Sequence, residues 1–126
     1  MTMSKLLEGK RGEEIAVLYL RRLGFQIVDR NFRIRGGEID IIAIDPSTGS
    51  GQDVLVFIEV KTRSSAQFGT PLEAIGYYKI KTLIRAAQFY KVKHPKLPDA
   101  MRIDGLGILL DEFGEATIDY VKDISS

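Results

Sequence analysis

The sequence predicts a single α/β domain in which helices flank a mixed sheet. The chain has 126 residues, which is enough for one hydrophobic core and too few for two. Two segments show apolar residues at helical spacing, and five shorter segments are strand-like runs rich in β-branched residues. Their order is α-β-β-β-α-β-β, without internal repeats. We therefore expect residues 1–126 to form one domain.

The first half of the chain predicts a helix followed by an antiparallel meander. Helical spacing covers residues 9–23, and Gly24 then supplies a stop signal. Strands are predicted at residues 25–34, 38–44 and 53–62. A tight turn at Gly36-Gly37 joins the first two strands, and residues 45–51 read as a loop before the third.

The second half predicts one long helix and two closing strands. Residues 63–69 are polar and irregular. The sequence Thr70-Pro71-Leu72-Glu73 is typical of a capping box with proline at the first helical position, so we expect a helix from there to about Lys93. Residues 94–99 read as a linker, and strands are expected at 101–110 and 116–121.

Composition excludes several classes of function. The chain contains no cysteine, so disulfides, thiolate catalysis and cysteine-based metal sites are excluded. The N-terminus shows no secretory signal, and no apolar run is long enough to span a bilayer, so a cytoplasmic protein without membrane association is expected. The net charge of +1 provides no overall attraction to polyanions, so any affinity for nucleic acid must come from local basic clusters.

The most informative feature is a set of charged residues in segments that otherwise form sheet. Glu59 and Lys61 lie two residues apart in an apolar strand, so their side chains point to the same face. Asp40 lies among isoleucines in the preceding strand. Burying charge without a partner is costly, so this arrangement requires a reason.

Two helical residues join this set by their angular position. At about 100° per residue, Glu13 falls on the apolar stripe of the first helix, whereas Glu14 falls on the solvent side. In the second helix, Lys79 falls within the stripe formed by Leu72, Ile75, Leu83, Ala86 and Tyr90. Lys81 falls on the opposite side.

Each of these residues also has a structural interpretation. Lys79 is equally consistent with an amine whose stem covers the core while its head reaches solvent. Glu59 and Lys61 can form an ion pair near a sheet edge, and Asp40 can lie where a strand frays. Arg102 and Asp104 share a strand face and are interpreted as a structural ion pair. Glu38 is expected to be exposed, and His94 to have no catalytic role.

Taken together, the charged residues are suited to metal-dependent phosphodiester hydrolysis. Mg²⁺ prefers oxygen ligands in octahedral geometry, which two carboxylates and a backbone carbonyl supply. The carbonyl of Val60 lies between Glu59 and Lys61 in the sequence and is the expected third ligand. Lys61 would orient or deprotonate the attacking water.

The spacing of Asp40 and Glu59-Val60-Lys61 resembles that of the restriction-endonuclease-like nucleases, whose hallmark is an acid and then acid-x-lysine on the next strand. More closely, the chain resembles the small bacterial YraN-type family, which is related in fold to archaeal Holliday-junction resolvases. Ile39 stands where the superfamily name, PD-(D/E)XK, has proline. The matching stretches are Gly12-Glu13-x-x-Ala16, Gly36-Gly37-Glu38-Ile39-Asp40, Phe57-Ile58-Glu59-Val60-Lys61-Thr62-Arg63, Phe68-Gly69, Lys79 and Arg102-Ile103-Asp104.

The resemblance implies a restriction-endonuclease-like domain with Mg²⁺, or Mn²⁺, held or supported by Glu13, Asp40 and Glu59. Lys61 would then be the catalytic lysine. We expect a DNA endonuclease, structure-specific or resolvase-like, in which Arg33, Arg35, Arg63 and Lys79 contact phosphates. The alternative is a catalytically silent nucleic-acid-binding or assembly module with the same fold. A homodimer and a protein partner are compatible with either.

Overall fold

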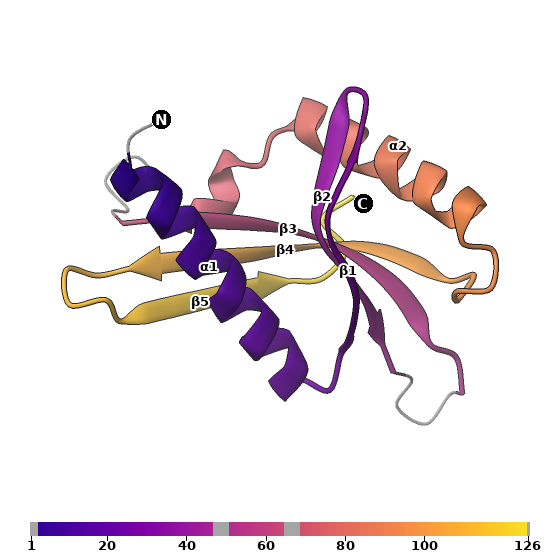
Figure 1. The fold of residues 1–126 in the computed structure, drawn as a ribbon, viewed down its shortest axis with the longest axis horizontal. Coiled ribbons are helices and arrows are strands. Elements are labelled where there is room, and N and C mark those ends of the chain that lie inside the picture. Colours follow the sequence, from indigo (N-terminus) through magenta and orange to yellow (C-terminus); the bar gives the residue numbers. More distant parts are fainter. Residues whose placement is uncertain (1–2, 47–50, 65–68, 126) are drawn as a thin grey trace.

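The computed structural model describes residues 3–46, 51–64 and 69–125, and within them the chain forms one α/β domain. A five-stranded mixed sheet has the order β1-β2-β3-β4-β5, and a helix packs on each face (Figure 1). This confirms the predicted fold class. Two parts of the sequence predictions lie outside the described residues. They are residues 47–50 of the predicted 45–51 loop and Phe68 of the stretches that match the YraN-type family. No helix in the described ranges is both long and apolar enough to cross a membrane.

The elements follow the predicted order, and β1, β2 and β3 form the expected antiparallel meander. β3 and β4 are parallel, and β4 and β5 are antiparallel. The bounds are α1 Met3–Arg22, β1 Gln26–Ile34, β2 Gly37–Asp45, β3 Val54–Arg63, η1 Pro71–Ala74, α2 Tyr77–Lys93, β4 Met101–Leu110 and β5 Ala116–Val121.

The structure corrects the predicted second helix. The chain forms a short 3₁₀ turn, η1, and then extends through Ile75 before α2 begins after Gly76. The side chain of Thr70 makes no capping hydrogen bond. Glycine is a poor helix former, and Leu72 packs instead against Gly105 of β4, so a continuous helix is not favoured.

Three smaller boundaries also differ from the prediction. α1 begins at Met3 rather than residue 9, because the segment before Gly9 consists mainly of good helix formers such as Leu6, Leu7 and Glu8. The helix ends at Arg22, so Leu23 is 46% exposed instead of lying on the buried stripe. Asp45 belongs to β2 rather than to the following loop, and Arg102 holds its carboxylate.

The sheet buries apolar side chains on both faces, which explains the nearly continuous apolar runs in β2 and β3. One core lies under α1 and includes Ala16, Leu20, Ile41, Val56, Ile58 and Leu106. The other lies under α2 and includes Ile42, Leu55, Phe57, Leu83, Ala86 and Tyr90.

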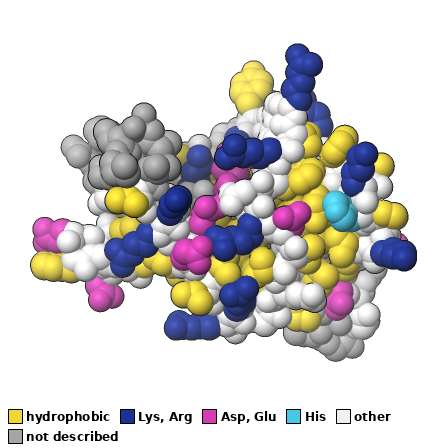
Figure 2. All heavy atoms as spheres, in the orientation of Figure 1, with side chains coloured by type: hydrophobic (Ala, Val, Ile, Leu, Met, Phe, Trp, Pro, Cys, Tyr) yellow, Lys and Arg dark blue, Asp and Glu magenta, His cyan; other side chains and the backbone are white. Residues whose placement is uncertain are grey.

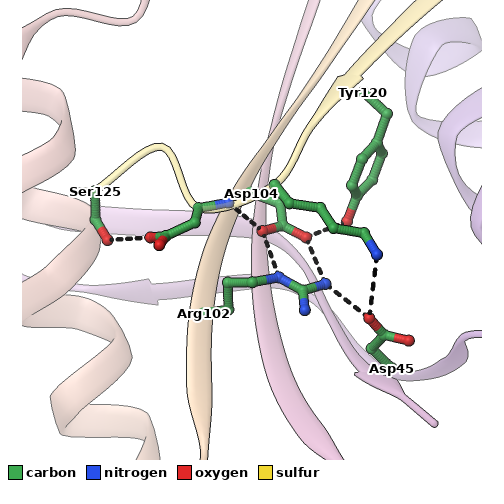
Figure 3. Close-up of polar contacts among 7 residues, drawn as sticks. Asp45, Arg102, Asp104, Tyr120 and Ser125 are labelled. Carbon is green, nitrogen blue, oxygen red and sulfur yellow. Dashed lines mark hydrogen bonds and ion pairs between the residues drawn. The ribbon is translucent and has the colours of Figure 1, made fainter. Parts of the chain in front are cut away.

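A buried ionic network ties the C-terminal strands to β2 (Figure 3). Arg102 donates two hydrogen bonds to Asp104, at 2.8 and 3.0 Å, and a third to Asp45 at 2.8 Å. The hydroxyl of Tyr120 and the backbone N–H of Asp123 also bind Asp104, which is fully buried. Arg102 and Asp104 thus form the structural ion pair that the sequence predicted.

The β1–β2 hairpin separates from the rest of the sheet beside the charged residues. The last pair between β2 and β3 is Ile41 with Ile58, whereas β3 continues to pair with β4 as far as Arg63. Asp40 and Glu59 are the next residues on the two diverging strands. The hairpin therefore rises away from β3 and leaves a fork in the sheet (Figure 1).

Candidate functional site

A cleft of about 620 Å³ occupies this fork. Its walls come from α1, the β1–β2 hairpin, β3 and α2, so segments distant in the sequence meet there. Acidic side chains gather in the middle of the face shown in Figure 2, with lysines and arginines around them. The cleft is lined by Glu8, Gly9, Lys10, Glu13, Asn31, Arg33, Glu38, Asp40, Glu59, Val60, Lys61, Thr62 and Lys79.

Glu59 is the most deeply buried acid of the cleft. Its side chain is 4% exposed and lies on β3, the central strand of the sheet. The ion pair with Lys61 that the sequence allowed is present, at the point where β3 no longer pairs with β2. The amines of Lys79 and Lys61 lie 3.6 and 3.8 Å from its carboxylate. Burial nevertheless outweighs these two cations and, with the negative charge of Asp40, raises the pKa of Glu59 to about 7.

Asp40 is fixed to the other strand of the fork. Its Oδ2 accepts a hydrogen bond of 2.8 Å from the backbone N–H of Val60. This side-chain contact joins the two strands just beyond Ile41 and Ile58, where the backbone pairing of β2 with β3 ends. The residue is half-buried, so it does not lie in a frayed strand. Burial raises its pKa, although the hydrogen bond from Val60 opposes that change.

Glu13 reaches the cleft because α1 approaches β3 closely. Gly12 is buried, and a Cβ at that position would collide with the side chain of Thr62. Burial and the charge of Asp40 raise the pKa of Glu13. The neighbouring Glu14 points to solvent and pairs with Arg30 at 2.7 Å, as the helical projection predicts for an ordinary surface acid.

The two lysines face the acids from different elements. Lys61 shares a strand face with Glu59, as predicted from strand alternation. Lys79 lies on the α2 face that carries Leu83. Its side chain is 31% exposed, and its amine lies beside the carboxylate of Glu59. The snorkelling interpretation of Lys79 therefore fails, since the amine turns into the cleft.

Two buried oxygens of these acids have no hydrogen-bond partner among the residues that the structure describes: Oε1 of Glu13 and Oε2 of Glu59. A buried carboxylate oxygen without a partner is costly, and a cation would satisfy both. The donor set thus fits a hard divalent cation. Among residues 3–46, 51–64 and 69–125, no three acidic or histidine side chains converge as a preformed metal cage. Metal binding would therefore have to draw the carboxylates together.

The arginines predicted to contact phosphates lie at different distances from this centre. Arg33 lines the cleft and pairs with Glu38 at 3.3 Å. Arg35 is exposed in the hairpin turn and does not line the cleft. Arg63 ends β3, and its Nε is buried without a hydrogen-bond partner among the described residues.

Sequence reasoning missed several residues of the cleft wall. Lys10 precedes Glu13 by three residues, so helical spacing alone places it on the same side of α1. Asn31 adopts a positive φ of 54° in β1, a conformation that asparagine tolerates better than most residues. Nothing in the local sequence marks this position as part of the cleft, because the fork forms only in the folded sheet. Glu8 and Thr62 complete this group.

Comparison with known proteins assigns the family. Residues 12–108, which carry all four catalytic candidates, match the model of the uncharacterised protein family UPF0102. The chain belongs to this family. The match confirms the predicted YraN-type resemblance, and the mixed sheet between two helices is the restriction-endonuclease-like fold that it implied.

The similarity to UPF0102 relatives extends over most of the chain. A UPF0102 protein of Arthrobacter sp. is 40% identical over 96% of this chain and 98% of its own length. One from Chlorobium phaeobacteroides is 44% identical over 90% of this chain and 86% of its own. One from Alkaliphilus oremlandii is 52% identical over 65% of each chain.

Proposed function

We propose that this UPF0102 protein is a Mg²⁺-dependent endonuclease that hydrolyses phosphodiester bonds in DNA. The observation that carries the proposal is the pair of unpartnered buried oxygens, on Glu13 and Glu59, that share one cleft with Asp40. A purely structural site would be expected to pair these acids. Here burial raises the pKa values of all three carboxyls, and the lysines beside Glu59 do not reverse that change.

The proposed roles follow from position. Glu13, Asp40, Glu59 and the carbonyl of Val60 would hold Mg²⁺ or Mn²⁺, which when bound polarises the scissile phosphate and acidifies water. The carboxylate of Glu59 holds the amine of Lys61 at the cleft, where that amine would orient the attacking water or remove its proton. Lys79 would offset the negative charge that develops on the phosphate oxygens.

The arginines would position the substrate. Arg33 lines the cleft, Arg35 lies in the hairpin turn and Arg63 ends β3, so phosphates could extend across the fork between them. Such contacts fix a duplex or a strand in place without reading its sequence. A homodimer, in which two clefts cut two strands symmetrically, remains a prediction that sedimentation velocity can test.

The test is cleavage of linear, nicked, flapped and four-way DNA with Mg²⁺, with Mn²⁺ and with EDTA. We expect product only with metal, and we expect Glu13→Gln to abolish it. Glu14→Gln is the matched control. Glu14 is the next residue of the same helix, and its carboxylate lies outside the cleft. Equal loss in both variants would indicate damage to α1 rather than removal of a ligand.

Absence of cleavage on all four substrates, with no effect of either metal on melting temperature, would contradict the proposal. If DNA binding persisted in that case, the silent nucleic-acid-binding module would be the better description. The same substrates made of RNA distinguish a preference for DNA from a general phosphodiesterase.

A further inference from the structure

The cleft continues into a second, shallower groove of about 280 Å³ between the β1–β2 hairpin and the start of α2. Arg85 of α2 donates a hydrogen bond of 3.1 Å to the carbonyl of Gly36, which holds the hairpin turn against the helix. The cleft and the groove share three lining residues, so an extended ligand that leaves the cleft on this side would lie along the groove. The shared residues are Arg33, Glu38 and Lys79.

Two exposed tyrosines begin α2, immediately before Lys79. The side chain of Tyr78 is 81% exposed and that of Tyr77 is 66% exposed, and neither belongs to a hydrophobic core. Their ring centroids lie 5.5 Å apart in a T-shaped arrangement. The amine of Lys81 lies 4.7 Å from the centroid of Tyr77, so one face of that ring is covered. Tyr78 is therefore the ring that is free to accept a partner.

The surroundings of these rings are basic. α2 contains five lysines and arginines and no acid, and the sequence contains no Asp or Glu between Glu73 and Asp99. Figure 1 places the tip of the β1–β2 hairpin and the start of α2 at the top of the molecule. In the same orientation, Figure 2 shows hydrophobic and basic side chains that project from this upper edge. Exposed aromatic rings on a helix that carries cations and no acid suit a polyanion with flat apolar groups, although Glu38 of the hairpin also lines the groove. Nucleic acid with unpaired bases has both properties.

We propose that Tyr78, supported by Tyr77 and Lys81, stacks an unpaired base of a strand that leaves the cleft along the groove. Bases inside a duplex are already stacked, so the ring discriminates in favour of DNA with a single-stranded segment beside the cleavage point. The preferred substrate would then be a flap, an overhang or an opened junction. This inference rests on the proposed function, since the groove begins at Lys79 of the acidic cleft.

The test measures binding in EDTA, so that it does not depend on cleavage. Fluorescence anisotropy would compare a labelled single strand, a flapped duplex and a blunt duplex. We expect Tyr78→Ala to weaken binding of the first two by roughly 5- to 100-fold and to leave blunt-duplex binding nearly unchanged. Tyr78→Phe should retain affinity because stacking needs the ring and not the hydroxyl, whereas Tyr78→Leu should not. Phe113→Ala is the control, since Phe113 is 84% exposed in the distant β4–β5 turn.

The outcomes separate this inference from the proposed function. Unchanged single-strand affinity in Tyr78→Ala, or an equal loss on all three ligands, would overturn the stacking role even if cleavage occurs. A selective loss in a protein that never cleaves DNA would support the stacking role and contradict only the nuclease. Failure of the wild-type protein to bind any of the three ligands at low salt would overturn both.

Discussion

At the scale of single residues, the cleft brings together three carboxyls that do not satisfy one another. Two lysines approach Glu59, yet burial still raises its pKa to about 7. Burial also raises the pKa values of Glu13 and Asp40; the charge of Asp40 adds to the effect at Glu13, and the charge of Glu38 adds to it at Asp40. Burial therefore raises the proton affinity of all three carboxyls, and a divalent cation bound there would compete with those protons.

Glu59→Gln tests this conclusion through pH. The pKa of Glu59 is about 7 in the folded protein, above its ordinary value of 4.5. The free energy of unfolding therefore receives the full contribution of this group below pH 4.5, and that contribution is lost as the pH rises to about 7. Glutamine imitates the protonated form. In EDTA, Glu59→Gln should therefore raise the free energy of unfolding at pH 8, by up to about 3 kcal/mol, and change it little at pH 5. Urea unfolding at both pH values measures the difference, and an equal effect at both would contradict it.

Asp40→Asn and Lys61→Ala separate metal binding from chemistry. Asparagine removes a repelling charge but can still accept the hydrogen bond from Val60, so the metal-free protein should melt higher and Mg²⁺ should no longer shift its melting temperature. Lys61→Ala leaves the carboxyls in place, so the metal-dependent shift should persist while hydrolysis is lost. Calorimetry with and without Mg²⁺ decides between these outcomes. A wild-type protein indifferent to metal, with Asp40→Asn melting lower, would show that the acids are structural.

At the scale of elements, the site depends on how closely α1 lies against β3. Gly12 allows this close approach, because Thr62 occupies the space that a side chain would need. The next residue, Glu13, is thereby brought to the cleft. Likewise, Gly105 and Gly107 of β4 leave room for Leu72 of η1, the turn that leads into α2 and Lys79.

Gly12→Ala should therefore destabilise the protein by about 1–3 kcal/mol, because overpacking pushes α1 away from β3. Gly9→Ala is the matched control, since a Cβ there meets nothing within 4 Å and alanine favours helix by about 0.5–1 kcal/mol. Thr62→Ala should restore part of the stability of Gly12→Ala. Urea unfolding of the wild type, the two glycine variants and the double variant checks this, and equal stability of both glycine variants would show that the contact is unimportant.

The order of elements and the faces of Glu13, Glu59 and Lys61 were predictable because they follow from local periodicity. Strand alternation and helical projection need no knowledge of tertiary structure. The fork between β2 and β3 was not predictable, because it reflects where pairing stops rather than any residue pattern. The break at Gly76 depends on the packing of Leu72 on β4, so the capping signal at Thr70 predicted a helix that tertiary contacts prevent.

At the scale of the whole molecule, charge is nearly balanced but unevenly distributed. The net charge is +1, whereas α2 carries five cations and no acid. Any affinity for a polyanion is therefore expected to depend on local basic clusters such as that of α2 and not on the net charge. This distinguishes local electrostatic recognition from non-specific attraction by an overall basic protein.

Salt dependence of DNA affinity provides the measurement at this scale. Each phosphate neutralised on duplex DNA lowers the slope of log K against log salt concentration by about 0.9, so wild-type affinity should fall steeply with salt. Arg35→Ala, in the exposed hairpin turn, should make that slope shallower by about one phosphate. Arg22→Ala, at the end of α1 far from the hairpin turn, should leave it unchanged (Figure 1). A slope near zero for wild type, or equal slopes for all three proteins, would show that the basic residues around the fork do not bind phosphates.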